Sequence, residues 1–116
     1  MRELVIKRIP VVDPKNKVNE VVVNIYYDKG GHNHFTGKNI NRGYYGSVLG
    51  VKREEVSVRF TAPIHGGVGA KIFLEEANRF SQKKLDDLYN DKHVLAKMDT
   101  LTQIIMAESD LKVAEI

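Results

Sequence analysis

The sequence VNEVVVNIYY, residues 18–27, carries the strongest strand signal in this chain of 116 residues. Its β-branched and aromatic side chains favour extended backbone, and neither glycine nor proline interrupts them. The run Val21-Val22-Val23 shows no alternation of apolar and polar residues. Such a run is typical of a strand with both faces covered, and we expect a strand of this kind here.

Directly after this segment, residues 29–46 read KGGHNHFTGKNINRGYYG and hold five of the nine glycines. Two histidines, three aromatic residues and three cations share the stretch, with no carboxylate. Glycine lets the backbone turn with positive φ and approach a ligand closely. Cations and flat rings suit a planar anionic partner such as a nucleotide or a single strand. We interpret the stretch as a ligand-contacting segment; the alternative is a long polar hairpin connection whose glycines only shape turns.

Two further strands are predicted on the C-terminal side of this glycine-rich stretch. The first, YYGSVLGVKR at residues 44–53, would carry Gly46 and Gly50 on one face. Those glycines leave the face shallow enough for another group to lie against it. The second, EVSVRFT at residues 55–61, alternates apolar and polar residues, which indicates a half-buried strand.

A shorter β-prone run, RELVIKRI at residues 2–9, precedes the central segment and is expected to stop at Pro10. Asp13-Pro14 and the polar residues after it are typical of a turn. Together, these segments predict an antiparallel sheet of about four strands within residues 1–61.

From residue 70 onward, the apolar spacing changes from two residues to about 3.6 residues, the period of an amphipathic helix. We therefore predict a helical part over residues 69–113, with two helices. Asn90-Asp91 would interrupt or cap the helical run, because both residues favour N-caps, and the second helix would start near Lys92. The apolar stripe of the first helix would include Phe73, Ala77 and Phe80.

The whole chain, residues 1–116, is thus expected to form one α+β domain, a sheet followed by two C-terminal helices. In the second helix, four apolar residues recur at spacings of four, three and four, which is the pattern of a helix–helix seam. Because the first helix would already cover the sheet, we expect this seam to contact another protomer of a homo-oligomer. The predicted interface residues are Val94, Met98, Leu101 and Ile105.

The absence of cysteine excludes disulfides and thiolate metal sites. The start, MRELVIKRIP, lacks the apolar run of a secretory signal, and no apolar stretch approaches the length of a membrane span. We therefore expect a cytoplasmic protein without a membrane partner. Residues 1–71 carry a charge balance of +6 and residues 72–116 one of −3, which places an anion-binding surface on the first part. This modest surplus fits a small anionic ligand better than a long duplex.

The segment HGGVGAK at residues 65–71 is glycine-rich and precedes the predicted helix, where free N–H groups could face an anion. It departs from the nucleotide triphosphatase loop, because Ala70 precedes Lys71 and Ile72 follows it. A generic anion-binding helix start and a simple strand-to-helix connection both remain open.

Metal and enzyme chemistry are the weaker interpretations. His32 and His34 could lie on one side of an extended segment with His65 as a third ligand, but no carboxylate-flanked metal pattern accompanies them. Ser47 has no identifiable base, and no nucleophile elbow is present in the sequence. We therefore expect no metal, no cofactor and no catalytic activity.

The leading prediction is a non-catalytic binder of a small anionic nucleotide. Arginine and lysine would hold phosphate, an aromatic ring would stack on a base, and the paired glycines would allow close approach. The predicted ligand-binding residues are Gly30, Gly31, Phe35, Arg42, Tyr44, Arg59, Gly66, Gly67 and Lys71. The alternatives are a module that binds single-stranded nucleic acid and an enzyme that processes a nucleotide.

The block YYDKGGHNHFTGKNINRGYYGSVLGVKRE, with the later EEANRFSQKKL, resembles small proteins of phages and conjugative elements that share a KGG-x-N-x-FTGK…RGYY pattern. The chain's size, its sheet-then-helices plan and its basic aromatic stretch also look like the phage anti-Thoeris sponges. That resemblance implies a homo-oligomer with pockets that involve more than one chain. It also implies sequestration, without degradation, of a cyclic ADP-ribose isomer that signals in bacterial anti-phage defence. The residues named above come from the physical interpretation and not from this resemblance.

Overall fold

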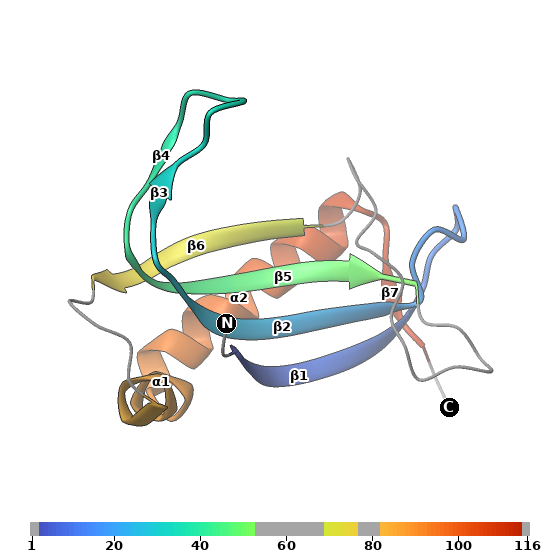
Figure 1. Ribbon diagram of the computed structural model, residues 1–116. Helices are drawn as coiled ribbons and strands as arrows, with labels where there is room; N and C mark the ends of the chain where they lie inside the picture. The colour runs from blue at the N-terminus through green and yellow to red at the C-terminus, as the bar shows by residue number, and fades with distance from the viewer. Residues whose placement is uncertain (1–2, 53–68, 77–81, 115–116) are drawn as a thin grey trace.

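The computed structural model describes residues 3–52, 69–76 and 82–114 (Figure 1). The fold is α+β, as predicted, with an antiparallel sheet and two helices. Its elements are β1 (Glu3–Val12), β2 (Glu20–Asp28), β3 (Gly31–His32), β4 (Asn39–Ile40), β5 (Gly43–Val51), β6 (Gly69–Glu76), α1 (Gln82–Tyr89), α2 (Lys92–Glu108) and β7 (Lys112–Val113). Among the described residues, neither helix combines the length and the apolar character needed to cross a membrane.

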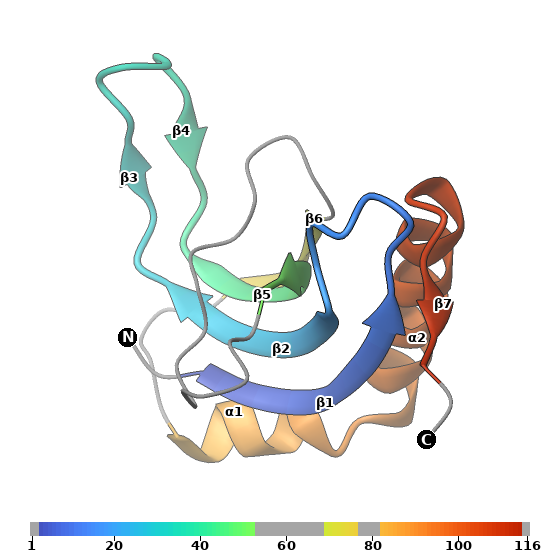
Figure 2. The same ribbon diagram turned by 90° about the vertical axis from the view of Figure 1, so that its right-hand side faces the viewer.

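The main sheet has the strand order β6-β5-β2-β1-β7, and β2 is its central strand. β2 pairs with β5 from Glu20↔Val51 to Asp28↔Gly43 and with β1 on its other side. Most of β2 is buried, which confirms the expectation of a strand covered on both faces. Figure 2 shows that the sheet curls and that both helices lie on the same side of it.

Strand β1 continues through Pro10 to Val12, so the prediction that proline ends it was wrong. The carbonyl of Pro10 accepts a hydrogen bond from the Ala114 amide, on the side of β1 that faces β7. The nitrogen of a strand residue faces the same side as its carbonyl, so the missing N–H costs no hydrogen bond to β2. Among the described strands, only the two-residue β7 pairs with β1 on that side, at Val11 and Val12, so Pro10 lies where the sheet is about to end and proline is tolerated.

Residues 69–76 form strand β6, and the predicted helix over this part of the chain was wrong. Alternate residues of β6 are partly buried and exposed, because the strand pairs with β5 along the edge of the sheet. The short α1 supplies the helix that follows. The expected helix contacts Ala77 and Phe80, and the predicted strand at 55–61, lie outside the described residues.

Helix α2 starts after Asp91, whose carboxylate accepts hydrogen bonds from the His93 and Val94 amides, so the predicted cap is confirmed. The helix packs across the sheet against Val21, Val23 and Val48. The glycine at position 46 makes this possible, since a Cβ there would lie 2.2 Å from the Sδ of Met98. The shallow strand face predicted from Gly46 is therefore occupied by the protein's own helix.

This packing removes the basis for assigning the α2 seam to an oligomer interface. Met98 is 1% exposed within the single chain and Ile105 is also buried, while Val94 and Leu101 pack against the same cluster. The predicted interface assumed that the first helix already covered the sheet, and that segment is instead strand β6. The homo-oligomer itself stays a prediction without these residues.

A second apolar cluster joins α1 to the end of the sheet. Leu85 and Leu88 of α1 pack against Ile25, Tyr27 and Tyr44. An ion pair closes the same end, since the ammonium of Lys84 lies 2.5 Å from a carboxylate oxygen of Glu75 on β6. This hydrogen bond and charge from Glu75 raise the pKa of Lys84.

Candidate functional site

Residues 29–42 form a β-hairpin arm that continues β2 and β5 beyond the sheet (Figure 1). We call these residues the arm. Strands β3 and β4 pair within it through Gly31↔Ile40 and His32↔Asn39. Every residue of the arm is exposed apart from the half-buried Gly30 and Ile40. Figures 1 and 2 show the arm bending away from the helices, so neither helix supports it.

The base of the arm depends on Gly30. This residue has a φ of +77°, and a Cβ on it would lie 2.7 Å from the carbonyl oxygen of Ile40 and 2.8 Å from the nitrogen of Arg42. Its amide donates to a carboxylate oxygen of Asp28 at 2.8 Å. The close approach that the sequence predicts at Gly30 is thus an approach of the arm's two strands to each other.

The tip of the arm is an ordered turn that presents Phe35. The side-chain oxygen of Asn33 accepts hydrogen bonds from the amides of Phe35 at 2.9 Å and Thr36 at 3.1 Å. Backbone hydrogen bonds between Asn33 and Lys38, and from Gly37 to Asn33, close the loop. The ring of Phe35 is fully exposed, so the turn holds an apolar ring in contact with water.

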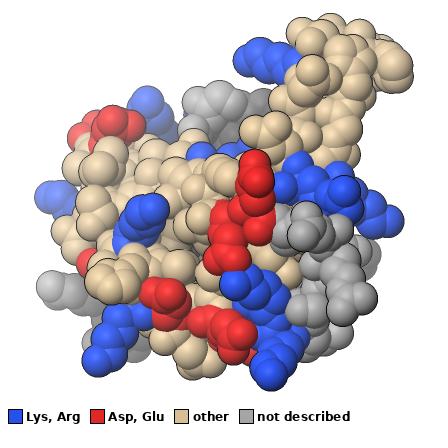
Figure 3. Space-filling view, turned by 90° about the vertical axis from the view of Figure 1, so that its left-hand side faces the viewer, with Lys and Arg blue, Asp and Glu red and all other residues tan. Residues whose placement is uncertain are grey.

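The arm carries one sign of charge. Lys29, Lys38 and Arg42 lie on it, and its sequence contains no carboxylate. In Figure 3 the arm is a tan projection that bears basic groups and no acidic ones. His32 donates through Nδ1 to the Asn39 side chain at 2.7 Å. No group of three metal-ligating side chains occurs in the described residues, and His65 lies outside them.

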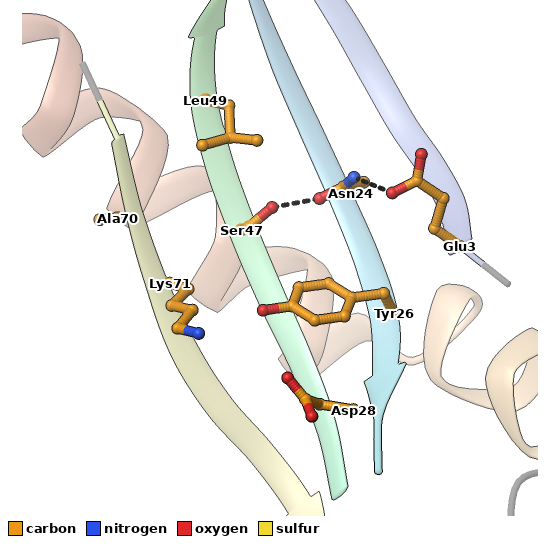
Figure 4. A pocket seen from close by; sticks show the side chains of 8 residues that line it. All are labelled: Glu3, Asn24, Tyr26, Asp28, Ser47, Leu49, Ala70 and Lys71. Carbon is orange, nitrogen blue, oxygen red and sulfur yellow. Dashed lines mark hydrogen bonds between the residues drawn. The ribbon is translucent and has the colours of Figure 1, made fainter. Parts of the chain in front are cut away.

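A pocket of about 480 Å³ lies on the sheet face opposite the helices, next to the base of the arm (Figure 4). We call it the sheet pocket. Its walls combine carboxylates, a lysine, a phenol, an amide and a hydroxyl with two apolar side chains. The lining residues are Glu3, Asn24, Tyr26, Asp28, Ser47, Leu49, Ala70 and Lys71.

A chain of hydrogen bonds crosses three strands on the floor of the sheet pocket. The hydroxyl of Ser47 donates to the amide oxygen of Asn24, and the amide nitrogen of Asn24 donates to a carboxylate oxygen of Glu3 at 2.7 Å (Figure 4). Asn24 and Ser47 are both buried. Buried polar groups with satisfied hydrogen bonds hold their side chains in one orientation.

A row of aromatic rings crosses the same sheet face beside the pocket. We call Tyr26, Tyr45 and Phe73 the aromatic row. The Tyr26 and Tyr45 rings stack with centroids 5.8 Å apart, and the Tyr45 and Phe73 rings meet in a T-shaped arrangement with centroids 5.2 Å apart. Phe73 is 41% exposed, and the ammonium of Lys71 lies 5.5 Å from the centroid of Tyr45.

The tyrosines of the aromatic row are hydrogen-bond donors at neutral pH. Burial raises the pKa of both Tyr26 and Tyr45, and the nearby Asp28 carboxylate raises each further. The hydroxyl of Tyr45 donates to the backbone carbonyl of Asn41 at 2.6 Å, which ties the row to the arm. The hydroxyl of Tyr26 points across the sheet pocket in Figure 4.

The structure does not bring the nine predicted ligand-binding residues into one site. Gly30, Gly31, Phe35 and Arg42 belong to the arm, whereas Lys71 lines the sheet pocket. The predicted stacking role of Tyr44 was wrong, because its side chain is 0% exposed and packs against α1. The remaining three, Arg59, Gly66 and Gly67, lie outside the described residues.

The site residues missed from the sequence are those of the neighbouring strands. Tyr26 and Asn24 lie in β2, where the unbroken apolar run conceals which side chains share a face. Alternation along β5 puts Tyr45 and Ser47 on the face opposite Gly46. Alternation therefore indicates which residues of β5 share a face, but it does not indicate which of the two faces the helices cover.

Comparison of the chain with protein families, with curated proteins and with solved structures finds no match. We therefore infer the function from the arm, the aromatic row and the sheet pocket.

Proposed function

We propose that the protein binds single-stranded nucleic acid through the arm and the aromatic row. The observation that carries this proposal is the fully exposed Phe35, held by a hydrogen-bonded turn at the tip of a basic arm without carboxylates. Bases of a single strand stack on such rings with about 1–3 kcal/mol each, whatever their identity.

The charge on the arm supports the same partner. Lys29, Lys38 and Arg42 provide cations within a segment of fourteen residues, from 29 to 42, and phosphates of a strand lying along it would meet no carboxylate. A small number of phosphate contacts gives a moderate salt dependence. The aromatic row then offers further ring surface on the sheet face at the base of the arm, with Phe73 exposed at its edge.

Sequestration of a small anionic nucleotide, in particular a cyclic ADP-ribose isomer, remains a second proposal. The sheet pocket has a volume in the range of small-molecule sites, which is about 300–1,000 Å³. However, its described lining contains two carboxylates, Glu3 and Asp28, and one cation, Lys71. That balance disfavours phosphate, so we place the strand-binding proposal first.

Fluorescence anisotropy with a labelled single-stranded oligonucleotide tests the proposal. We expect the whole protein to bind at low salt and binding to weaken as salt rises, because each phosphate contact releases counterions. Phe35→Ala should weaken binding about five- to 150-fold, the loss of one stacked base. Ile104→Ala is the matched control, since Ile104 is an exposed apolar residue of α2.

The outcomes separate the two proposals. Strand binding that is insensitive to Phe35→Ala would contradict the role of the arm. Absence of oligonucleotide binding, together with a higher melting temperature in the presence of a cyclic dinucleotide or ADP-ribose derivative, would favour sequestration instead.

A further inference from the structure

The sheet pocket lies where a strand bound to the arm would reach the sheet. Asp28 joins the two features, because its carboxylate lines the pocket while one of its oxygens accepts the amide of Gly30 at the base of the arm. The ring of Tyr45 stacks on that of the pocket residue Tyr26, and the Tyr45 hydroxyl donates to the Asn41 carbonyl of the arm. A base that unstacks at the arm's base is therefore next to the pocket.

Several polar atoms of the pocket have hydrogen-bonding capacity left over. Glu3 uses one carboxylate oxygen on Asn24, and Asp28 uses one on Gly30. Within the described part of the chain, the Tyr26 hydroxyl makes no hydrogen bond and the Lys71 ammonium no ion pair. Figure 4 shows the side chains of Tyr26, Asp28 and Lys71 extending over the same hollow.

The charged side chains of the sheet pocket determine which kind of ligand it can bind. Two carboxylates accept hydrogen bonds from N–H groups and repel phosphate, while Lys71 on β6 donates to an oxygen or ring nitrogen at the far side. The ring of Tyr26 provides a face on which a flat heterocycle can stack. The pocket thus suits a neutral planar ring with N–H donors on one edge and acceptors on another.

We propose that the sheet pocket binds one guanine base. Guanine presents two adjacent N–H donors, N1–H and the N2 amino group, which one carboxylate can accept together. Its O6 and N7 atoms are the acceptors that a lysine side chain contacts on guanine in nucleic-acid complexes. Thymine offers a single N–H donor, and adenine and cytosine each offer one amino group. The arm then supplies affinity for any strand and the pocket supplies preference for guanine, so this proposal deepens the proposed function and rests on it.

Titrating the isotope-labelled whole protein with each of the four nucleosides, observed by NMR, tests the pocket without the arm's contribution. We expect guanosine to shift the amide signals of Asn24, Ser47 and Lys71. It should bind at least about tenfold more tightly than thymidine, because a ligand that leaves polar groups of the site unpaired binds much more weakly. Equal affinity for the four nucleosides, shifts confined to other residues, or no binding at millimolar concentration would each overturn the proposal.

Variants connect the preference to the carboxylates. Because one carboxylate accepts both donors, either Glu3→Gln or Asp28→Asn should remove most of the guanosine preference, while Glu108→Gln, an exposed carboxylate of α2, should leave it unchanged. Asp28→Asn also alters the acceptor at Gly30, so Gly30→Ala, which disturbs the base of the arm without removing a carboxylate, should keep the guanosine preference. Unchanged preference in Glu3→Gln and in a folded Asp28→Asn would contradict the assignment.

The failures of the two proposals are distinguishable. Oligonucleotide binding that depends on Phe35 without a guanosine preference would remove the pocket proposal and leave the proposed function intact. Guanosine binding without any binding of oligonucleotides would contradict the strand-binding proposal and support the pocket as a nucleoside site.

Discussion

Strands β2 and β5 run through two regions of opposite character. Inside the sheet, Val21, Val23 and Val48 are 0% exposed and pack under α2. In the arm, the same two strands continue into residues 31–39, all of which are exposed. The sheet part is held by burial of apolar surface, and the arm by the hydrogen bonds of its turns. This difference implies that substitutions in the sheet change stability, whereas substitutions in the arm change binding.

The largest effect is expected in the core. Met98→Ala should lower the free energy of unfolding by about 2–5 kcal/mol, because Met98 is almost fully buried against Gly46. Chemical denaturation measures the change. In the Gly46→Ala background the loss should be smaller, since the shorter side chain makes room for the added methyl group. A loss below about 1 kcal/mol would contradict the packing of α2 on the sheet.

The base of the arm should give an intermediate effect. Gly30→Ala combines a left-handed backbone with contacts of 2.7 and 2.8 Å to the opposite strand. The left-handed conformation alone costs about 1–2 kcal/mol for a residue with a Cβ. We expect weaker oligonucleotide binding and faster hydrogen exchange in the arm. Gly31→Ala is the comparison that isolates the clash, because Gly31 also has a positive φ, +138°, but a Cβ there meets no atom within 4 Å. Identical binding by the protein and the Gly30 variant would show that arm geometry is irrelevant.

Tyr44 tests the border between the two regions. Its hydroxyl is buried, and it has no hydrogen-bond partner among the described residues. Tyr44→Phe should therefore leave the free energy of unfolding unchanged or raise it by up to about 1 kcal/mol, because a buried hydroxyl without a partner is unfavourable. Strand binding should not change. A clear loss of binding would contradict the placement of Tyr44 in the core under α1.

The smallest effect concerns the turn before β2. Hydrogen bonds from the Lys15, Lys17 and Val18 amides lower the pKa of Asp13, the Lys15 bond most, against a smaller opposing effect of burial. A lowered pKa in the folded state stabilises the protein above the unfolded-state pKa of about 3.9, and this contribution is lost as pH falls through the folded-state value. Asp13→Ala should lower the melting temperature slightly at pH 7, and the difference in melting temperature between the variant and the unchanged protein should decrease below about pH 4. A difference in melting temperature that does not depend on pH would contradict the role of the carboxylate charge.

Sequence patterns predicted the structural features that depend on interactions between residues close together in the chain. The central strand, the cap at Asp91 and the second helix follow from propensity and capping, and the hairpin at residues 29–42 is the alternative that turn chemistry offered for the glycine-rich stretch. Residues 69–76 were mistaken for helix because apolar side chains at 72–74 fit both periods. Pairing with β5 decides between these periods, and single-sequence patterns do not contain that information.

The same limit applies to the site. The basic and aromatic character of the arm is visible in its composition, and Lys71, predicted to hold phosphate at a helix start, lies on strand β6 and lines the sheet pocket. Which tyrosine of the Tyr44-Tyr45 pair faces the helices depends on where α1 and α2 pack. The combination of Glu3, Asn24 and Ser47 in one hydrogen-bonded chain requires the register of three strands.

The contribution of the arm is tested most directly by shortening it. Replacing residues 33–38 with Asn-Gly joins His32 to Asn39, which are already paired, through a two-residue turn and removes Phe35 and Lys38. We expect an unchanged melting temperature and at least about tenfold weaker binding of a single-stranded oligonucleotide in fluorescence anisotropy. A shortened protein that binds the oligonucleotide as tightly as the intact chain would contradict this expectation.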